Sequence, residues 1–161
     1  MREILFRGKA INRDKGYHRT NYKNGEWVYG LITRLYDEQF ENLPAEMTDI
    51  NGVSGIEVDY KTIGQFTGLH DSTKWEQLTE KEQAEWLENH TANEWNGKKI
   101  FEGDIIREQY GCSYDDFRVE FTLGGFNMIY IKTNRGKYAW YGENGEVVGN
   151  IHDNPELLNN N

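Results

Sequence analysis

The sequence has 161 residues, of which 37% are hydrophobic, and a formal net charge of −9 at pH 7. This length suits one ordinary domain or two small units that share a core, and it is too short for most multi-domain enzymes. Five Trp, ten Tyr and seven Phe supply large apolar area, which excludes a disordered chain. No stretch approaches the roughly 20 apolar residues that span a bilayer. The single cysteine, Cys112, forms no internal disulfide, so we expect a reducing cytoplasm.

The charge is unevenly distributed along the chain. Residues 1–35 contain eight Lys or Arg against three Asp or Glu, a net +5, so the remainder carries −14. We expect this basic N-terminal arm to meet an acidic surface on its own body, on a second copy, or on an outside polyanion. The pI of about 5.0 argues against nucleic acid as that polyanion, because phosphate neutralisation supplies most non-specific affinity.

The first half of the chain shows a hairpin pattern. Residues 17–22 and 27–32 flank Asn24-Gly25, a pair that favours the positive φ values of a type I′ turn, and they therefore predict a β-hairpin. Residues 37–59 are rich in Gly, Asn, Ser and acids and contain Pro44, which is typical of a loop and turn region. A strand is predicted to follow over residues 56–63.

The composition then shifts to Glu, Gln, Lys, Trp and Asn. Thr79 and Glu82 have the spacing of a helix capping box, which predicts one short helix over about residues 79–90. Its apolar face holds only Ala84 and Leu87 with a tryptophan beside them, which is too narrow to seat it deep in a core. We expect this helix to lie on the surface.

Strand signals return after Asn96-Gly97 and are joined by turns that contain Gly and Asn. Residues 117–123 alternate apolar and polar side chains, the pattern of a sheet with one solvated face. Several short strands at hairpin distance favour a small barrel or curled meander, because closure removes exposed edges. The predicted strands cover residues 99–109, 117–123, 126–133, 138–141 and 147–151.

Five segments occur in a recognisable order: residues 1–8, 25–30, 62–69, 96–106 and 147–158. In this order they resemble the YopX-like family of phage and prophage proteins of Gram-positive bacteria. In simpler members the segment equivalent to residues 68–71 runs almost directly into the one at residue 96, so residues 72–95 look like an insertion. The resemblance implies an SH3-like barrel in the C-terminal part and assembly into homo-oligomers, and it implies no activity.

We therefore expect a mainly β protein, α+β overall, that folds as one cooperative body. Residues 1–70 are expected to form an N-terminal β-hairpin unit. Residues 71–95 are expected to form an inserted helical segment with one short helix. Residues 96–161 are expected to form a small barrel, which the resemblance implies is SH3-like.

Glu102 and Asp104 are the most tempting chemical pair, since two nearby carboxylates divide acid and base roles in many enzymes. The structural interpretation is stronger. An Asp just after Gly103 typically accepts hydrogen bonds from backbone N–H groups of its own turn. We therefore expect a turn that opens the barrel, with Asp104 as its anchor.

Other catalytic or metal-binding patterns are weak. His18, His70, His90 and His152 lie far apart and share no ligand spacing, so no metal or cofactor is expected. Cys112 is a lone cysteine among acidic residues and is a poor candidate for a nucleophile. The sequence has no nucleotide-binding or hydrolase motif.

Some aromatic residues in the predicted strands are candidates for an interface. Aromatic side chains in short strands usually pack across the sheet, although they also stack on nucleic-acid bases. Because Trp140 and Tyr141 are adjacent, they face opposite ways, so one of them lies near the surface. The possible interface residues are Trp27, Tyr29 and Trp140, and the structural signature residues are Glu102, Gly103, Asp104, Gly149, Asn150 and Pro155.

Taken together, these patterns favour a non-enzymatic phage or prophage accessory protein that acts by binding. The expected partners are copies of itself and a host or phage protein in the cytoplasm of a bacterial host, without membrane attachment. The alternative is nucleic-acid binding through the basic N-terminal arm. A variant of the binding hypothesis is an acidic surface that mimics DNA, and an enzyme ranks third because it requires convergent titratable groups in a pocket.

Overall fold

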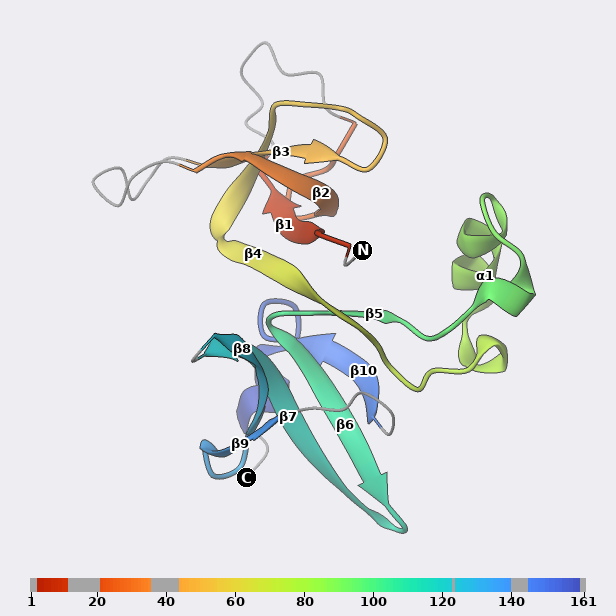
Figure 1. The fold of residues 1–161 in the computed structure, drawn as a ribbon, viewed down its shortest axis with the longest axis vertical. Helices are drawn as coiled ribbons and strands as arrows, with labels where there is room; N and C mark the ends of the chain where they lie inside the picture. The colour runs from red at the N-terminus through yellow and green to blue at the C-terminus, as the bar shows by residue number, and fades with distance from the viewer. Residues whose placement is uncertain (1–2, 12–20, 36–43, 123, 140–144, 160–161) are drawn as a thin grey trace. The chain divides into compact units, whose positions relative to one another are not determined.

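The computed structural model describes residues 3–11, 21–35, 44–122, 124–139 and 145–159, in two units, Met1–Phe66 and Thr67–Asn161 (Figure 1). Within these ranges ten β-strands accompany a single α-helix, which confirms the mainly β fold. No helix in the described ranges is long and apolar enough to cross a membrane. The strands that begin in the first unit are β1 (Phe6–Ala10), β2 (Trp27–Arg34), β3 (Ala45–Asp49) and β4 (Ile56–His70), of which β4 continues into the second unit.

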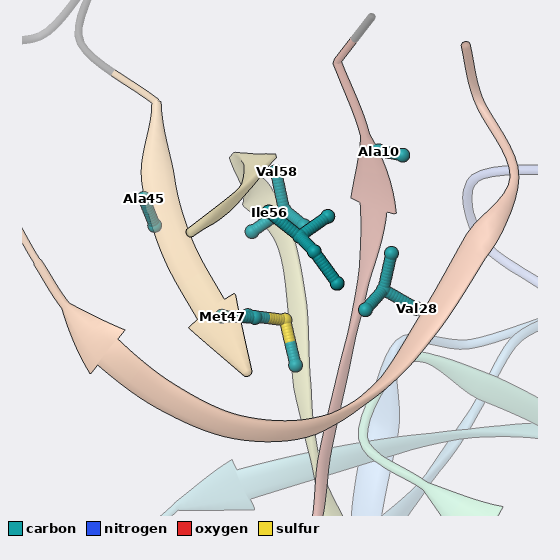
Figure 2. Packing of buried hydrophobic residues seen from close by; sticks show 6 residues of the cluster. All are labelled: Ala10, Val28, Ala45, Met47, Ile56 and Val58. Carbon is teal, nitrogen blue, oxygen red and sulfur yellow. The ribbon is translucent and has the colours of Figure 1, made fainter. Parts of the chain in front are cut away.

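The four strands of the first unit form a closed ring. β1 pairs antiparallel with both β2 and β4, β2 pairs with β3, and β3 pairs with β4. In this ring each of the four strands pairs with two others, and the ring encloses a small apolar core. Figure 2 shows that Val28, Met47, Ile56 and Val58 point into this core, and each is fully buried.

The turn at Asn24-Gly25 is present, but the strand that pairs with β2 differs from the prediction. Gly25 has φ +80°, and the Glu26 amide donates to the Lys23 carbonyl at 3.1 Å. The strand that precedes this turn and pairs with β2 is β1, with Lys9 opposite Trp27. The strand predicted over residues 17–22 is not formed at residues 21–22, and the remainder of it lies outside the described residues. The inward positions of β1 include Gly and Ala, which carry little hydrophobic signal, so its pattern is hard to see in the sequence.

The prediction of a loop over residues 37–59 is wrong for residues 45–49, which form β3. The three buried side chains of β3 are Ala45, Met47 and Asp49, and the last is a carboxylate. Asp49 is buried because its Oδ1 atom accepts the amides of Asn51 and Val53, at 2.9 and 2.8 Å, in the following turn. A polar residue at an inward position hides the strand alternation. β4 is also longer than predicted and extends to His70.

The second unit contains the helical segment followed by a five-stranded antiparallel sheet in the order β10-β6-β7-β8-β9. Its buried cluster comprises Ile100, Ile106, Phe117, Val119 and Met128. The elements are η2 (Trp75–Gln77), α1 (Glu80–Leu87), η3 (Ala92–Glu94), β5 (Lys99–Phe101), β6 (Asp104–Tyr110), β7 (Ser113–Thr122), β8 (Gly125–Tyr130), β9 (Arg135–Ala139), β10 (Gly145–Asn150) and η4 (Pro155–Asn159).

The predicted short helix is confirmed. The hydroxyl of Thr79 accepts the Glu82 amide, and the Glu82 carboxylate accepts the Thr79 amide at 2.9 Å, so the capping box is formed as the spacing predicts. No residue of α1 is buried, and Leu87 is 52% exposed. The two apolar residues of the predicted narrow face, Ala84 and Leu87, therefore both face solvent.

Candidate functional site

The Glu102-Gly103-Asp104 turn links three strands of the second unit. Asp104 is only 1% exposed, and its carboxylate accepts the Phe101 amide at 2.8 Å, as the turn interpretation requires. Gly103 has φ +84° and interrupts what the sequence predicts as one strand, so that β5 and β6 are separate. Its amide donates to Val119 of β7, and its carbonyl accepts the amide of Ile151, just after β10.

The second signature block forms a turn at the end of β10. The side-chain oxygen of Asn150 accepts the amides of His152 and Asp153, each at 2.9 Å. A Cβ atom on Gly149 would lie 2.4 Å from the Oδ1 atom of Asn154, so glycine is required for this close approach. Pro155 then begins η4. Because Asp104 and Asn150 are partners in the pairing of β6 with β10, the structure brings the two signature blocks together.

Asp71 is a structural centre that the sequence reasoning did not identify. It is 5% exposed, and its Oδ1 atom accepts the amides of Thr73 and Lys98 at 3.0 and 2.7 Å. Its Oδ2 atom accepts the Thr73 hydroxyl at 2.7 Å and the Val147 amide at 2.8 Å. One carboxylate therefore joins the start of the helical segment, the approach to β5, and β10. The bond from Thr73 to Asp71 is a local Asx turn, which is the only one of these bonds that the sequence spacing signals.

The residues beside Asp71 also cover the edge of β10 that faces away from β6. The Ser72 amide donates to the Gly145 carbonyl at 2.9 Å, in addition to the bond between Val147 and Asp71. An exposed strand edge is a template for unwanted pairing, and these bonds satisfy part of it.

The helical segment has an aromatic cluster of its own. The Trp95 ring lies at 5.0 Å from Trp86 and 6.2 Å from Trp75, both edge to face, and Trp86 stacks on His90 at 4.0 Å. The indole N–H of Trp95 donates to the Thr73 carbonyl, and that of Trp86 donates to the Thr91 carbonyl. These rings pack α1 against the rest of the helical segment, a role that Ala84 and Leu87 do not have.

Two of the ion pairs in the second unit join neighbouring elements. Glu82 accepts Lys98 Nζ at 2.8 Å, and this hydrogen bond, with the bonds from Thr79, lowers the pKa of Glu82 to about 2. Arg107 of β6 donates two hydrogen bonds to Asp116 of β7, at 2.7 and 2.8 Å, and the hydrogen bond to Asp116 raises the pKa of Arg107. Both arrangements are structural ties between neighbouring elements.

The outer side of β2 carries a row of apolar residues, of which Tyr29 and Leu31 are exposed and Trp27 is half-buried. Trp27, Tyr29 and Leu31 alternate with the inward Val28 and Gly30. Tyr29 is 37% exposed, Leu31 is 53% exposed, and Ile50, whose amide donates to the Tyr29 carbonyl, is 71% exposed. We refer to Trp27, Tyr29, Leu31 and Ile50 as the β2 face.

Basic residues lie at both ends of the β2 face. The Arg7 guanidinium and Lys9 Nζ lie 4.6 and 5.3 Å from the centre of the Trp27 ring. Arg34, with a side chain 58% exposed, stands at the end of β2 and pairs with Glu46. Two of the three predicted interface residues, Trp27 and Tyr29, thus share one face, and Trp140 lies outside the described residues.

The candidate chemical groups do not converge in the described part of the chain. Cys112 is exposed at the tip of the β6–β7 hairpin, whereas His90 lies in the aromatic cluster and His152 follows β10. His70 ends β4, and His18 is outside the described residues. The structure shows no group of three or more His, Cys, Asp or Glu among the described residues that would hold a metal ion.

Comparison with known protein families matches residues 92–159 to the family described as YopX protein. This part of the chain is therefore similar to the YopX family. The matched region contains the two signature blocks that meet at Asp104 and Asn150, and it extends from η3 to η4. Most of the helical segment and the whole first unit precede it. No curated protein matches the chain.

Proposed function

We propose that this chain is a non-enzymatic binding module that associates with copies of itself and with a host or phage protein through the β2 face. The exposed apolar residues Tyr29, Leu31 and Ile50 carry the proposal. Exposed apolar side chains that gather on one face, with polar residues at the rim, are typical of protein interaction sites. The buried carboxylates Asp71 and Asp104 accept backbone amides, which supports structural roles for them and not catalytic ones.

The proposal includes an SH3-like barrel for the strands of the second unit. Its support is the strand order β10-β6-β7-β8-β9, in which the last strand of the chain returns to lie beside the first of the five. Phage or prophage origin and action in the bacterial cytoplasm belong to the same proposal and follow from the family resemblance.

Light scattering over a range of protein concentrations tests the proposal. We expect a mass above 18.9 kDa that rises with concentration for the unmodified chain. Leu31→Glu places a charge on the β2 face and is expected to return the mass to that of a monomer with little change in melting temperature. Leu69→Glu, at another exposed leucine outside the β2 face, is the matched control and is expected to associate normally. A monomer at every concentration would overturn self-association.

A second candidate function is nucleic-acid binding by the basic arm. Lys9 beside the Trp27 ring favours it, since bases stack on aromatic rings while nearby cations contact the phosphates. A gel shift at low salt with the unmodified chain and with Lys9→Glu tests this function. No retardation at micromolar protein would reject it.

A further inference from the structure

The side of α1 that faces solvent is both apolar and acidic. Glu82, Gln83 and Trp86 are turned toward the rest of the helical segment, where they bond to Lys98, to the Trp75 carbonyl and to the Thr91 carbonyl. Ala84 lies on the opposite side of the helix and Leu87 lies at its flank, one turn from Gln83, and both are exposed. Glu80 and Glu88 stand on this same side at helical spacing and are also exposed. We refer to Glu80, Ala84, Leu87 and Glu88 as the α1 face.

The α1 face and the β2 face have complementary character. Both present exposed leucine, with Leu87 52% and Leu31 53% exposed. The α1 face carries Glu80 and Glu88, with the Lys81–Glu85 pair beside it, whereas the β2 face is flanked by Lys9 and by Arg34, which pairs with Glu46. An amphipathic helix that places an apolar side on an apolar surface is a common recognition mode, and opposite charges at the rim set its orientation.

The net charges of the two segments match as well. Residues 71–95 contain seven Asp or Glu and two Lys, a net −5, against +5 for residues 1–35. Two segments of opposite charge attract over distances near the Debye length, about 10 Å at 0.1 M salt. The apolar centres of the two faces then supply the short-range part of the contact.

We propose that the α1 face of one copy of this chain packs on the β2 face of a second copy. This inference rests on the proposed self-association and names the surface that meets the β2 face. Such a contact is heterologous, because different surfaces of the two copies meet, so repetition of it builds a closed ring or an open chain of subunits.

Charge reversal on each face tests the contact. One variant carries Glu80→Lys with Glu88→Lys, and the other carries Lys9→Glu with Arg34→Glu. Each variant alone brings like charges together at the contact and is expected to be monomeric by light scattering. In an equimolar mixture each α1 face finds a β2 face of opposite charge, so the mass is expected to recover.

A matched control separates this contact from the effect of net charge. Glu76→Lys with Glu85→Lys makes the same change of charge in the helical segment but lies off the α1 face, and it is expected to associate as the unmodified chain does. Melting temperatures of all variants confirm that they are folded.

The outcomes distinguish this contact from the proposed function. Reversed variants that keep the unmodified mass, or a mixture that stays monomeric, would overturn the pairing of the two faces while self-association stands. Loss of mass in the control as well would also overturn it, because net charge alone then explains the effect. A monomeric unmodified chain would overturn both proposals.

Discussion

Asp104 and Asn150 face each other across the antiparallel pair of β6 and β10, and each anchors a turn with its side chain. Asp104 accepts the amide of Phe101, and Asn150 accepts the amides of His152 and Asp153. Two sequence blocks of the region that matches the YopX family are thus parts of one structural unit. Because these side chains anchor turns, substitutions at them are expected mainly to lower the stability of the fold.

Asp104→Ala is expected to lower the free energy of unfolding by about 2 kcal/mol, because it leaves the buried Phe101 amide without this acceptor. Chemical denaturation of the full chain measures the change. Glu102→Ala, at a more exposed acid of the same turn, is the control and is expected to cost less. If Asp104→Ala melted normally but lost a defined binding activity, the anchor role would be wrong.

Gly97→Ala is expected to be among the most damaging glycine substitutions in the second unit. Gly97 has φ +101°, and a Cβ atom there would lie 2.0 Å from the Asp71 carbonyl oxygen. We expect a cost of about 3 kcal/mol or more, measured by thermal or chemical denaturation. Gly111→Ala is the control, since Gly111 also has positive φ but open space around it, and about 1 kcal/mol is expected there. Equal costs would show that the close approach to Asp71 is unimportant.

Asp71→Asn is expected to loosen the contacts among the helical segment, β5 and β10 without unfolding the chain. The amide group of Asn replaces one acceptor oxygen by a donor, so either Lys98 and Thr73 or Val147 loses its partner. Hydrogen exchange is expected to speed up at the Lys98, Thr73 or Val147 amides by about tenfold or more. Asp153→Asn, in the turn after β10, is the control. Uniform acceleration at all amides would instead indicate a global loss of stability.

Glu82→Gln is expected to flatten the pH dependence of stability in acid. The pKa of Glu82 is about 2 in the folded chain, below its ordinary value of 4.5, because Lys98 and Thr79 donate to it. The charged form therefore stabilises the fold above about pH 4.5, and this contribution is lost as pH falls toward 2. The effect is modest, under about 1 kcal/mol, since solvent screens the half-exposed pair. Unfolding curves from pH 2 to 7 measure it, and identical curves for both proteins would contradict it.

The sequence predicted correctly those elements that depend on interactions between residues close together in the chain. The helix over Glu80–Leu87 follows from the Thr79 and Glu82 capping box, which needs only residues three apart. The positive φ values of Gly25 and Gly103 follow from turn chemistry in the same way. β3 was missed because its inward position 49 is an aspartate whose burial depends on the next turn.

By itself the sequence determined the β-rich class, the single short helix, the turn at Asp104 and the YopX resemblance, because each depends on neighbouring residues or on residue order. The tertiary structure decided that β1 pairs with β2 and closes a ring with β4, and that Asp71 joins segments far apart in the chain. It also decided which sides of β2 and α1 face solvent. Long-range pairing is set by how buried faces fit one another, and alternation of residue types along one strand does not specify its partner.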